Sequence, residues 1–270
     1  MSSEFIELKM PDVSPSGLAV MEMVSDENFD ILKLSKAISQ DPVLSSIVLK
    51  YANAPIYRSL VEITNVRQAI SILGLKNVRM AVVVATMRSF DKGPNKLAQI
   101  FWNHSFAIAT LCRLLAKKVV PHLAEDIELT GLLHEMGALV LLTNFKQQYQ
   151  EVVDTSLRDG IDLEDVEKQV FGVNHNELLT RLLSDMRLPE MTFYAINDLA
   201  DMDTVELLGR DVDYHMAIVA LAHHILFSQS GAEQHPTEHM PDNLASLSER
   251  LSLKQDDIEK IVAEFELSRP

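Results

Sequence analysis

The sequence predicts an all-α protein, and three observations support this fold class. The chain has only nine glycines among 270 residues, and 47% of its residues are apolar, with twelve methionines among them. Such a composition favours helix over sheet. Apolar residues also recur every three or four positions, which is the helical period, and no segment shows a strand pattern that we would defend. We therefore expect a bundle of about fourteen helices.

Capping residues and glycines delimit the helices of the first ninety residues. The pair Asp41-Pro42 joins a good N-cap to a proline at the first helical position. Asn28 and Thr64 are expected to cap two further helices, and Gly74 is placed to end a helix in the left-handed conformation. The expected helices cover residues 17–24, 29–40, 42–51, 65–73 and 76–90.

The run Asp-Lys-Gly-Pro at residues 91–94 is the clearest break in the first half of the chain. A chain of 270 residues can form one large domain or two modest ones. We therefore predict a smaller N-terminal helical subdomain over residues 1–92 and a second helical subdomain over residues 93–270.

Glycines and one asparagine delimit the helices of the second half. Gly160 and Gly172 are expected helix stops, and Asn174 is an expected N-cap. The helices predicted from these signals and from the apolar spacing cover residues 96–119, 125–142, 145–158, 163–170, 175–187, 189–199, 212–229, 244–251 and 256–266, with a loop at 231–242.

The predicted helix over residues 125–142 is central, because it is apolar on most of its circumference. It nevertheless carries an imidazole and a carboxylate side by side, at His134 and Glu135. Buried polar groups cost free energy unless they are paired or ligated. These two side chains must therefore be hydrogen-bonded, bind a metal or face a cleft.

Composition and charge exclude several classes of function. A formal charge of −15 would repel nucleic-acid phosphates and anionic lipid headgroups, so we expect neither nucleic acid nor membrane as a partner. The single Cys112 permits no internal disulfide, and no signal or membrane-spanning segment is evident, which favours the cytoplasm. No phosphate-binding glycine loop, zinc-type cysteine pair or nucleophile elbow is present, and no cofactor is expected.

Histidines are the remaining candidates for chemistry. His104, His134, His175 and His223 lie on four different predicted helices, each in apolar sequence. Helices of one bundle can bring such residues together into a metal site. Alternatively, each is an ordinary histidine that is hydrogen-bonded to a neighbour. The residues alone leave both possibilities open.

Six short sequence pieces occur in a characteristic order along the chain. They are Asp41-Pro42-Val43-Leu44, Leu49-Lys50-Tyr51-Ala52-Asn53-Ala54, Ala69-Ile70-Ser71-Ile72-Leu73-Gly74, Trp102-Asn103-His104-Ser105, Gly131-Leu132-Leu133-His134-Glu135-Met136-Gly137 and Leu188-Pro189. Taken together they resemble the HDOD family, the HD-related output domain of bacterial signalling proteins. The resemblance covers about residues 11–229, followed by a C-terminal helical extension. It implies a small N-terminal helical subdomain joined to an HD-like bundle, a bacterial source and a regulatory role.

The resemblance also implies a test for metal binding, because related HD hydrolases use a His, an adjacent His-Asp pair and a later Asp. His104 and His134 match the first two ligands, but Glu135 replaces the Asp and is one methylene longer. The later Asp falls at or beside His223, and a further expected His pair is replaced by Leu199-Ala200. We expect no bound metal and interpret the candidates as vestigial, namely His104, His134, Glu135, His175 and His223.

We therefore hypothesise a non-catalytic signalling module that acts by binding another protein. Few Lys or Arg residues lie near the candidate centre in the sequence, and the nearest are Arg113 and Arg181. A phosphate dianion would therefore have few positively charged groups to bind it. The first alternative is a metal-dependent phosphohydrolase of nucleotides or cyclic dinucleotides. The second alternative is a small-molecule sensor that uses the remnant cleft.

Overall fold

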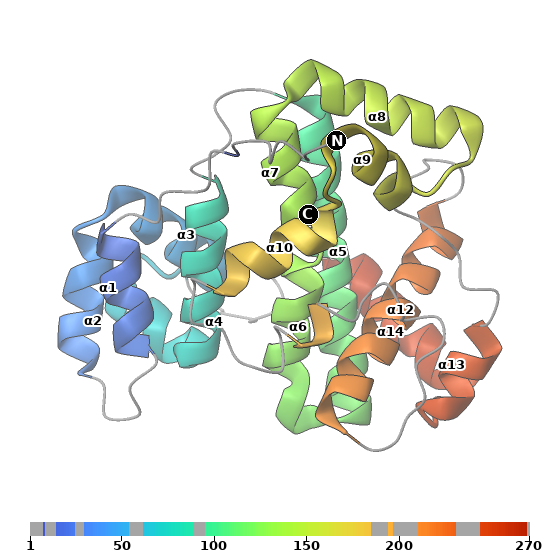
Figure 1. Ribbon diagram of the computed structural model, residues 1–270. Coiled ribbons are helices and arrows are strands. Elements are labelled where there is room, and N and C mark those ends of the chain that lie inside the picture. The colour runs from blue at the N-terminus through green and yellow to red at the C-terminus, as the bar shows by residue number, and fades with distance from the viewer. Residues whose placement is uncertain are drawn as a thin grey trace. The chain divides into compact units, whose positions relative to one another are not determined.

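In the computed structural model, the regular elements of the described residues are all helices, which confirms the all-α prediction (Figure 1). The described residues are 8, 15–24, 30–53, 62–88, 95–184, 194–196, 210–230 and 244–268. The chain forms two compact units, which are described separately below. One comprises Pro11–Gly93, and the other comprises Pro94–Arg269 together with Met1–Met10.

Helix α4 is the centre of the N-terminal unit, since the other three helices of the unit all contact it. These four helices are α1 (Pro15–Val24), α2 (Ile31–Ser39), α3 (Pro42–Ala52) and α4 (Val66–Arg88). Their shared core consists of aliphatic side chains with no exposed surface, including Val20, Leu34, Ile38, Val48, Ala69 and Val83.

Two of the expected N-caps in this unit differ by one or two residues from those in the structure. Asp41 caps α3 as predicted, but Asp30 caps α2 instead of Asn28, which lies outside the described residues. At α4 the cap is Asn65, whose Oδ1 accepts a backbone N–H at 2.8 Å, and not Thr64. In each case the capping side chain belongs to the residue directly before the first helical residue, which is the position that can reach the free N–H groups.

The prediction for Gly74 is confirmed, with φ at 72°, in the left-handed region. The structure joins the two helices expected around it into α4, with a kink at this glycine. One stretch of α4, Val66–Ala85, is apolar and long enough to span a membrane, but 61% of its most apolar window is buried within the protein. This burial is typical of a core helix.

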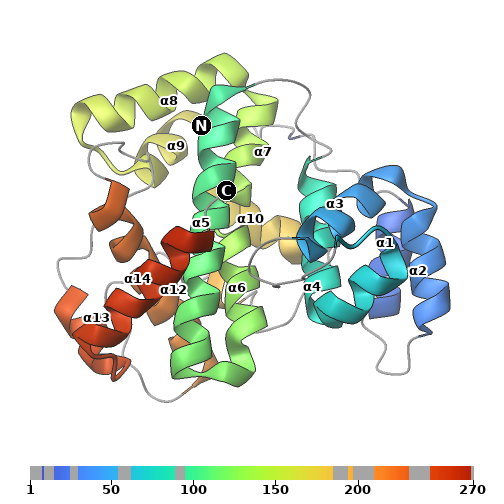
Figure 2. The same ribbon diagram turned by 180° about the vertical axis from the view of Figure 1, so that it is seen from behind.

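The C-terminal unit is built on two helices that run side by side, α5 (Lys96–Val119) and α6 (Ala124–Leu133), linked by the 3-10 turn Pro121–Leu123 (Figures 1 and 2). Gly131 permits their close approach, since a Cβ there would lie 2.8 Å from Cys112 Sγ. Helix α12 (Asp211–Ser230) packs against both. These three helices supply the side chains of the candidate site.

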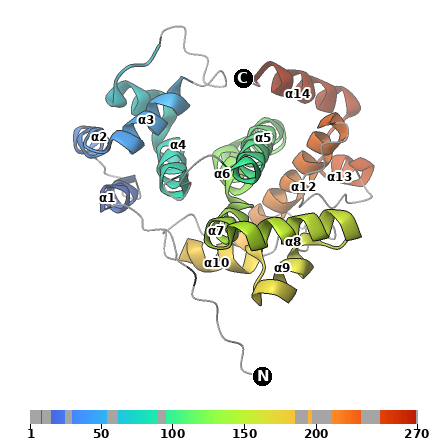
Figure 3. The same cartoon turned by 90° about the horizontal axis from the view of Figure 1, so that it is seen from above.

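The remaining helices of this unit surround that framework. Helices α8 and α9 contact each other beside α7, as the view from above shows (Figure 3), and α10 contacts α7 and α9. Gly160 and Gly172 end α8 and α9 with φ of 63° and 72°, as predicted. The bounds are α7 (Met136–Asn144), α8 (Lys146–Asp159), α9 (Leu163–Phe171), α10 (His175–Ser184), α13 (Leu244–Arg250) and α14 (Gln255–Ser268).

The prediction of one continuous helix over residues 125–142 was wrong. The structure has α6 and α7 separated by His134 and Glu135, and Glu135 leaves the helical conformation with φ −105° and ψ 7°. At Gly137 the backbone of α7 lies so close to α10 that a Cβ would be 1.9 Å from the His175 carbonyl oxygen. We attribute the break to this crossing of α10 over the start of α7.

Two other predicted segments lie mostly or wholly outside the described residues. Of the helix expected over 189–199, only residues 194–196 are described, and these are helical. The loop expected at 231–242 is not described. The helix expected over 175–187 is observed as α10 up to Ser184, where the described residues end.

Candidate functional site

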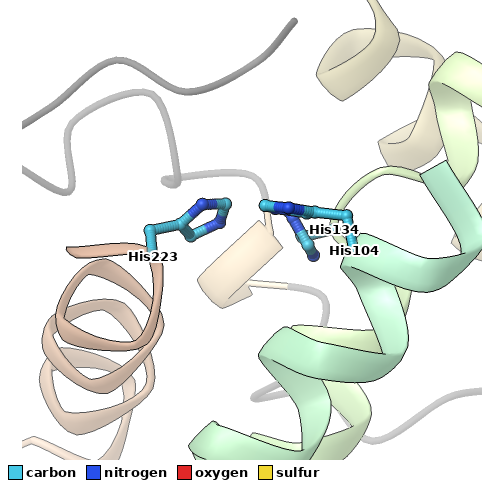
Figure 4. Close-up of side chains that lie close together, drawn as sticks. All are labelled: His104, His134 and His223. Atoms are coloured by element: carbon cyan, nitrogen blue, oxygen red, sulfur yellow. The ribbon is translucent and has the colours of Figure 1, made fainter. Parts of the chain in front are cut away.

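Three histidines from distant parts of the sequence meet inside the C-terminal unit. His104 comes from the middle of α5, His134 from the α6–α7 junction and His223 from α12, and each is only 6% exposed. One ring nitrogen of each lies within 4.8 Å of those of the other two. Figure 4 shows the ring of His223 directed toward those of His104 and His134. We call these three residues the histidine cluster.

The rings face one another at angles that leave nitrogens directed into the cluster. Ring centroids are separated by 5.6 Å for His104 and His134, 5.0 Å for His104 and His223, and 4.8 Å for His134 and His223. The rings of His134 and His223 are nearly perpendicular, at 89°. The cluster is therefore not a parallel stack of rings.

The orientation of His134 is fixed by the backbone of its own helix. Its Nδ1 lies 2.6 Å from the carbonyl oxygen of Gly131, and since a carbonyl only accepts, Nδ1 carries the proton. In the neutral ring, Nε2 then has its lone pair available. A backbone carbonyl that holds one ring nitrogen in this way is the usual support of a metal-binding histidine.

His223 is held in the neutral form. Burial, reinforced by the neighbouring His134, lowers the pKa of His223 well below its usual range. A neutral imidazole is the form that donates an electron pair to a metal.

Glu135 is fully buried, and its Oε2 lies 4.0 Å from Nε2 of His134. It is close to the edge of the histidine cluster, but among the described residues the group with metal-ligand spacing comprises histidines only. In this chain Glu135 stands where the HD hydrolases have the Asp of their His-Asp pair, and the candidate metal ligands are all imidazole nitrogens.

His175, the fourth histidine candidate, lies in a different network. Its backbone N–H and its Nδ1 both donate to Oε2 of Glu167, each at 2.7 Å, and Tyr149 donates to Oε1 of the same carboxylate. Burial opposes a charge on His175, but Glu167 outweighs it and raises the pKa of His175 to about 9. His175 is therefore a buried cation that fastens α10 to α9.

The arginine nearest the centre in sequence is neutralised by a carboxylate. Arg113 on α5 forms a buried ion pair with Glu128 on α6. Burial raises the pKa of Glu128 to about 7, although Arg113 opposes this shift. Arg113 therefore serves the packing of two helices and is not a free cation for a phosphate.

The other histidines of α12 have separate environments. His215 has no exposed surface, and its Nδ1 lies 2.8 Å from Oγ1 of Thr130 on α6. His224 is 8% exposed and follows His223 directly, but it is not a member of the histidine cluster.

The donor atoms of the histidine cluster suit some divalent cations and not others. Imidazole nitrogen is a good ligand for Zn²⁺, Cu²⁺ and Ni²⁺, whereas Mg²⁺ and Mn²⁺ prefer carboxylate, carbonyl and water oxygens. Nitrogen ligands at about 2.1 Å from a tetrahedral ion are about 3.4 Å apart, so modest ring movements would close the cluster around one. The cluster fits a zinc-class ion and does not fit a magnesium-type site.

Sequence reasoning singled out the members of the histidine cluster but missed the partners of the other buried groups. Glu167 follows Leu163 by four positions and so shares the buried face of its helix. That spacing was the available signal. The partners of Tyr149 and Glu128 could not be assigned from the sequence, because Glu167 and Arg113 lie on other helices.

Comparison with known proteins identifies the family. The HDOD domain model matches residues 10–201, and the chain belongs to this family. Among curated proteins no relative matches the chain. The resemblance stated from the six sequence pieces is thereby confirmed.

Solved structures share the fold at low sequence identity. An HDOD domain protein from Geobacter sulfurreducens is 24% identical, with a TM-score of 0.71, covering 96% of this chain and 90% of its own. The "Putative phosphohydrolase" of Shewanella amazonensis SB2B is 21% identical, with a TM-score of 0.71, covering 96% of this chain and 94% of its own. The MmoQ response regulator of Methylococcus capsulatus is 23% identical, with a TM-score of 0.51, covering 96% and 99%.

Proposed function

We propose that this chain is a non-catalytic regulatory module of a signalling pathway and that it acts by binding another protein. The observation that carries the proposal is the chemistry of its central site. Where an HD hydrolase uses carboxylate and imidazole ligands together, the described residues supply a group of three imidazoles. Each of these three residues is only 6% exposed, so little of their surface is accessible to a phosphodiester.

Electrostatics support the same proposal. Phosphoryl transfer needs cations that meet the charge developing on the phosphate. Arg113 is paired with Glu128, and His175, the buried cation on α10, is paired with Glu167. With a formal charge of −15 in the whole chain, an anionic substrate would also be repelled over long range.

The competing function is metal-dependent phosphohydrolysis, and one observation favours it. Three histidines, completed by a water molecule, also form the ligand set of some catalytic zinc sites. Structures that share the fold include proteins described both as a phosphohydrolase and as a response regulator. The choice therefore depends on the site and not on the fold.

The deciding experiment is a turnover assay on the full-length chain with and without added Zn²⁺, Ni²⁺, Mn²⁺ or Mg²⁺. Substrates should include bis(p-nitrophenyl) phosphate and cyclic dinucleotides, and the His134→Ala variant gives the background. We expect the native chain and the variant to be indistinguishable. Metal-dependent turnover that disappears in His134→Ala would overturn the proposal in favour of the hydrolase.

Protein binding is tested separately. We expect the full-length chain, immobilised and exposed to an extract of its native host, to retain a specific protein. The retained protein should bind the purified chain saturably in calorimetry, and its affinity should be unchanged by His134→Ala because the cluster is buried. A loss of binding in that variant, with its helical content intact, would contradict recognition through the outer surface.

A further inference from the structure

The histidine cluster has a capability that the proposed function does not assign. Its three members come from α5, the α6–α7 junction and α12, which are elements separated by up to 119 positions in sequence (from 104 to 223). Three imidazoles that are buried against one another lose hydrogen bonds to water. The free-energy cost of this loss must be offset by interactions inside the protein. A single ion at their centre would provide such an interaction for all three.

We propose that His104, His134 and His223 form a binding site for one zinc-class divalent cation, and that the ion clamps α12 to α5 and the α6–α7 junction. The ligand atoms are imidazole nitrogens within 4.8 Å of one another. The inference stands apart from the proposed function, since an ion in this place can stabilise the fold whether or not anything is hydrolysed.

Three features of the structure support a site for an ion over an accidental meeting of rings. Nδ1 of His134 is held by the Gly131 carbonyl, so Nε2 is the nitrogen that carries the lone pair in the neutral ring. The three rings point toward one another from two sides, as Figure 4 shows. The cluster is enclosed by helices that pack directly, since α12 contacts both α5 and α6. The core therefore brings the three rings together, and only modest ring movements are needed for them to bind one ion.

The ligand set also determines which ion is bound. The carboxylate ligands on which Mg²⁺ and Mn²⁺ depend in HD hydrolases are absent from the cluster as described, because His223 stands at the position of the later Asp. Zn²⁺ and Co²⁺ accept three imidazoles in tetrahedral geometry, with water or the nearby Glu135 carboxylate in the fourth position. The site therefore discriminates by donor chemistry against the cations of its catalytic relatives.

The test uses the full-length chain without a polyhistidine tag, stripped with EDTA, desalted and titrated with ZnCl2, CoCl2 or MgCl2. We expect one Zn²⁺ or Co²⁺ per chain, a rise in the melting temperature with either ion and no rise with Mg²⁺. His223→Ala should weaken Zn²⁺ binding by at least about 100-fold, since losing even an outer-shell partner costs 10–100-fold.

His224→Ala is the matched control, because His224 is the adjacent residue on the same helix and is similarly buried, at 8% exposure. It should leave the affinity for Zn²⁺ unchanged. If His223→Ala fails to fold by circular dichroism, X-ray absorption of the zinc-loaded native chain decides by counting imidazole ligands. Three imidazole ligands support the site, and fewer overturn it.

Several results would overturn the inference. These are equal Zn²⁺ affinity in the native chain and a folded His223→Ala variant, no saturable binding of Zn²⁺ or Co²⁺, or the same stabilisation by Mg²⁺ as by Zn²⁺. Its failure is distinguishable from that of the proposed function. Uptake of Zn²⁺ without phosphodiester turnover leaves both standing, uptake with turnover overturns only the proposed function, and no uptake overturns only the metal site.

Discussion

His175 and Glu167 illustrate how much one buried ion pair can contribute to the stability of the fold. Both are covered almost completely, and a charge placed there is tolerated only because the partner carries the opposite one. The carboxylate is further satisfied by Tyr149 and by the His175 backbone N–H. Three groups therefore share one carboxylate, and removing any of them leaves polar atoms buried without their present partner.

This pair predicts a specific dependence of stability on pH. The pKa of His175 is raised to about 9 in the folded chain from 6.5, so the folded state binds more protons between these values. Its contribution to the free energy of unfolding is then complete below pH 6.5 and lost as the pH rises through 9. The loss should be on the order of 3 kcal/mol. Urea unfolding at intervals from pH 6 to pH 10 measures it.

The control for the pH dependence is His175→Gln, which cannot acquire the charge. That variant should be less stable at pH 6.5, and its stability should vary less between pH 6.5 and pH 9 than that of the native chain. If the two curves run parallel across this interval, His175 is not the group responsible.

At the scale of the element, three features meet within four residues at the junction between α6 and α7. They are the end of one helix, the close approach of α10 and a member of the histidine cluster. His134 joins the cluster, Glu135 turns the backbone, and Gly137 lets α10 cross. The position of the imidazole thus depends on the backbone of a helix that begins 41 positions further along the chain, at His175.

Gly137→Ala tests this crossing. Its Cβ would meet the His175 carbonyl oxygen at 1.9 Å, and because that atom belongs to the backbone, one helix must move. We expect a loss in the free energy of unfolding of about 3 kcal/mol or more, at the upper end of the cost of overpacking. The loss is measured by urea denaturation.

Gly160→Ala provides the comparison, since the space around Gly160 is open and only its φ of 63° opposes a side chain. It should cost about 1–2 kcal/mol, the penalty for an L residue in the left-handed region. Equal losses in the two variants would show that the contact with His175 is not the source of the effect.

The cap of α3 gives a second prediction at this scale. Oδ1 of Asp41 accepts two backbone N–H groups of α3, at 2.9 and 3.1 Å, and Oδ2 accepts the hydroxyl of Ser16 on α1 at 2.6 Å. Asp41→Ala should cost about 1–2 kcal/mol of unfolding free energy. Asp41→Asn should retain most of the stability in thermal melts, because an amide oxygen also caps. A similar loss in both would indicate that the charge or the bond to Ser16, and not capping, is the source of the effect.

The ends of most helices could be predicted from the sequence because their causes are local. Asp41-Pro42 starts a helix and Gly160 stops one through groups within a turn of themselves. The break at His134 and Glu135 was missed, since its cause is the approach of His175 from another helix. The pairing of His175 with Glu167 was likewise invisible, whereas the meeting of His104 and His134 was expected from resemblance to a family.

At the scale of the whole molecule, all the buried polar networks discussed above belong to the C-terminal unit. The histidine cluster, the His175 network and the Arg113–Glu128 pair involve helices α5 to α12, within Pro94–Arg269. The N-terminal unit has its own aliphatic core around α4. Each unit therefore has the hydrophobic interior that independent folding requires.

This division predicts that a fragment of residues 94–270 folds alone. It should show a helical circular dichroism spectrum and a cooperative thermal transition, because it contains all of the C-terminal unit except Met1–Met10. The control is the same fragment with Leu132→Ala, which removes a fully buried side chain and should lower the melting temperature. A fragment with no cooperative transition would show that the N-terminal unit is required for its stability.

Cys112 is the only thiol of the chain and has no exposed surface. Burial also raises the pKa of its thiol. Maleimide reagents should therefore not react with Cys112 in the folded state. The native protein therefore contributes no background labelling when probes are attached to introduced cysteines. Cysteines introduced at the exposed Lys33 on α2 and Glu151 on α8 would be the sole labelling positions, one in each unit. A donor and an acceptor dye on that pair would then follow in solution, by energy transfer, how the separation of the units responds to an ion or a partner.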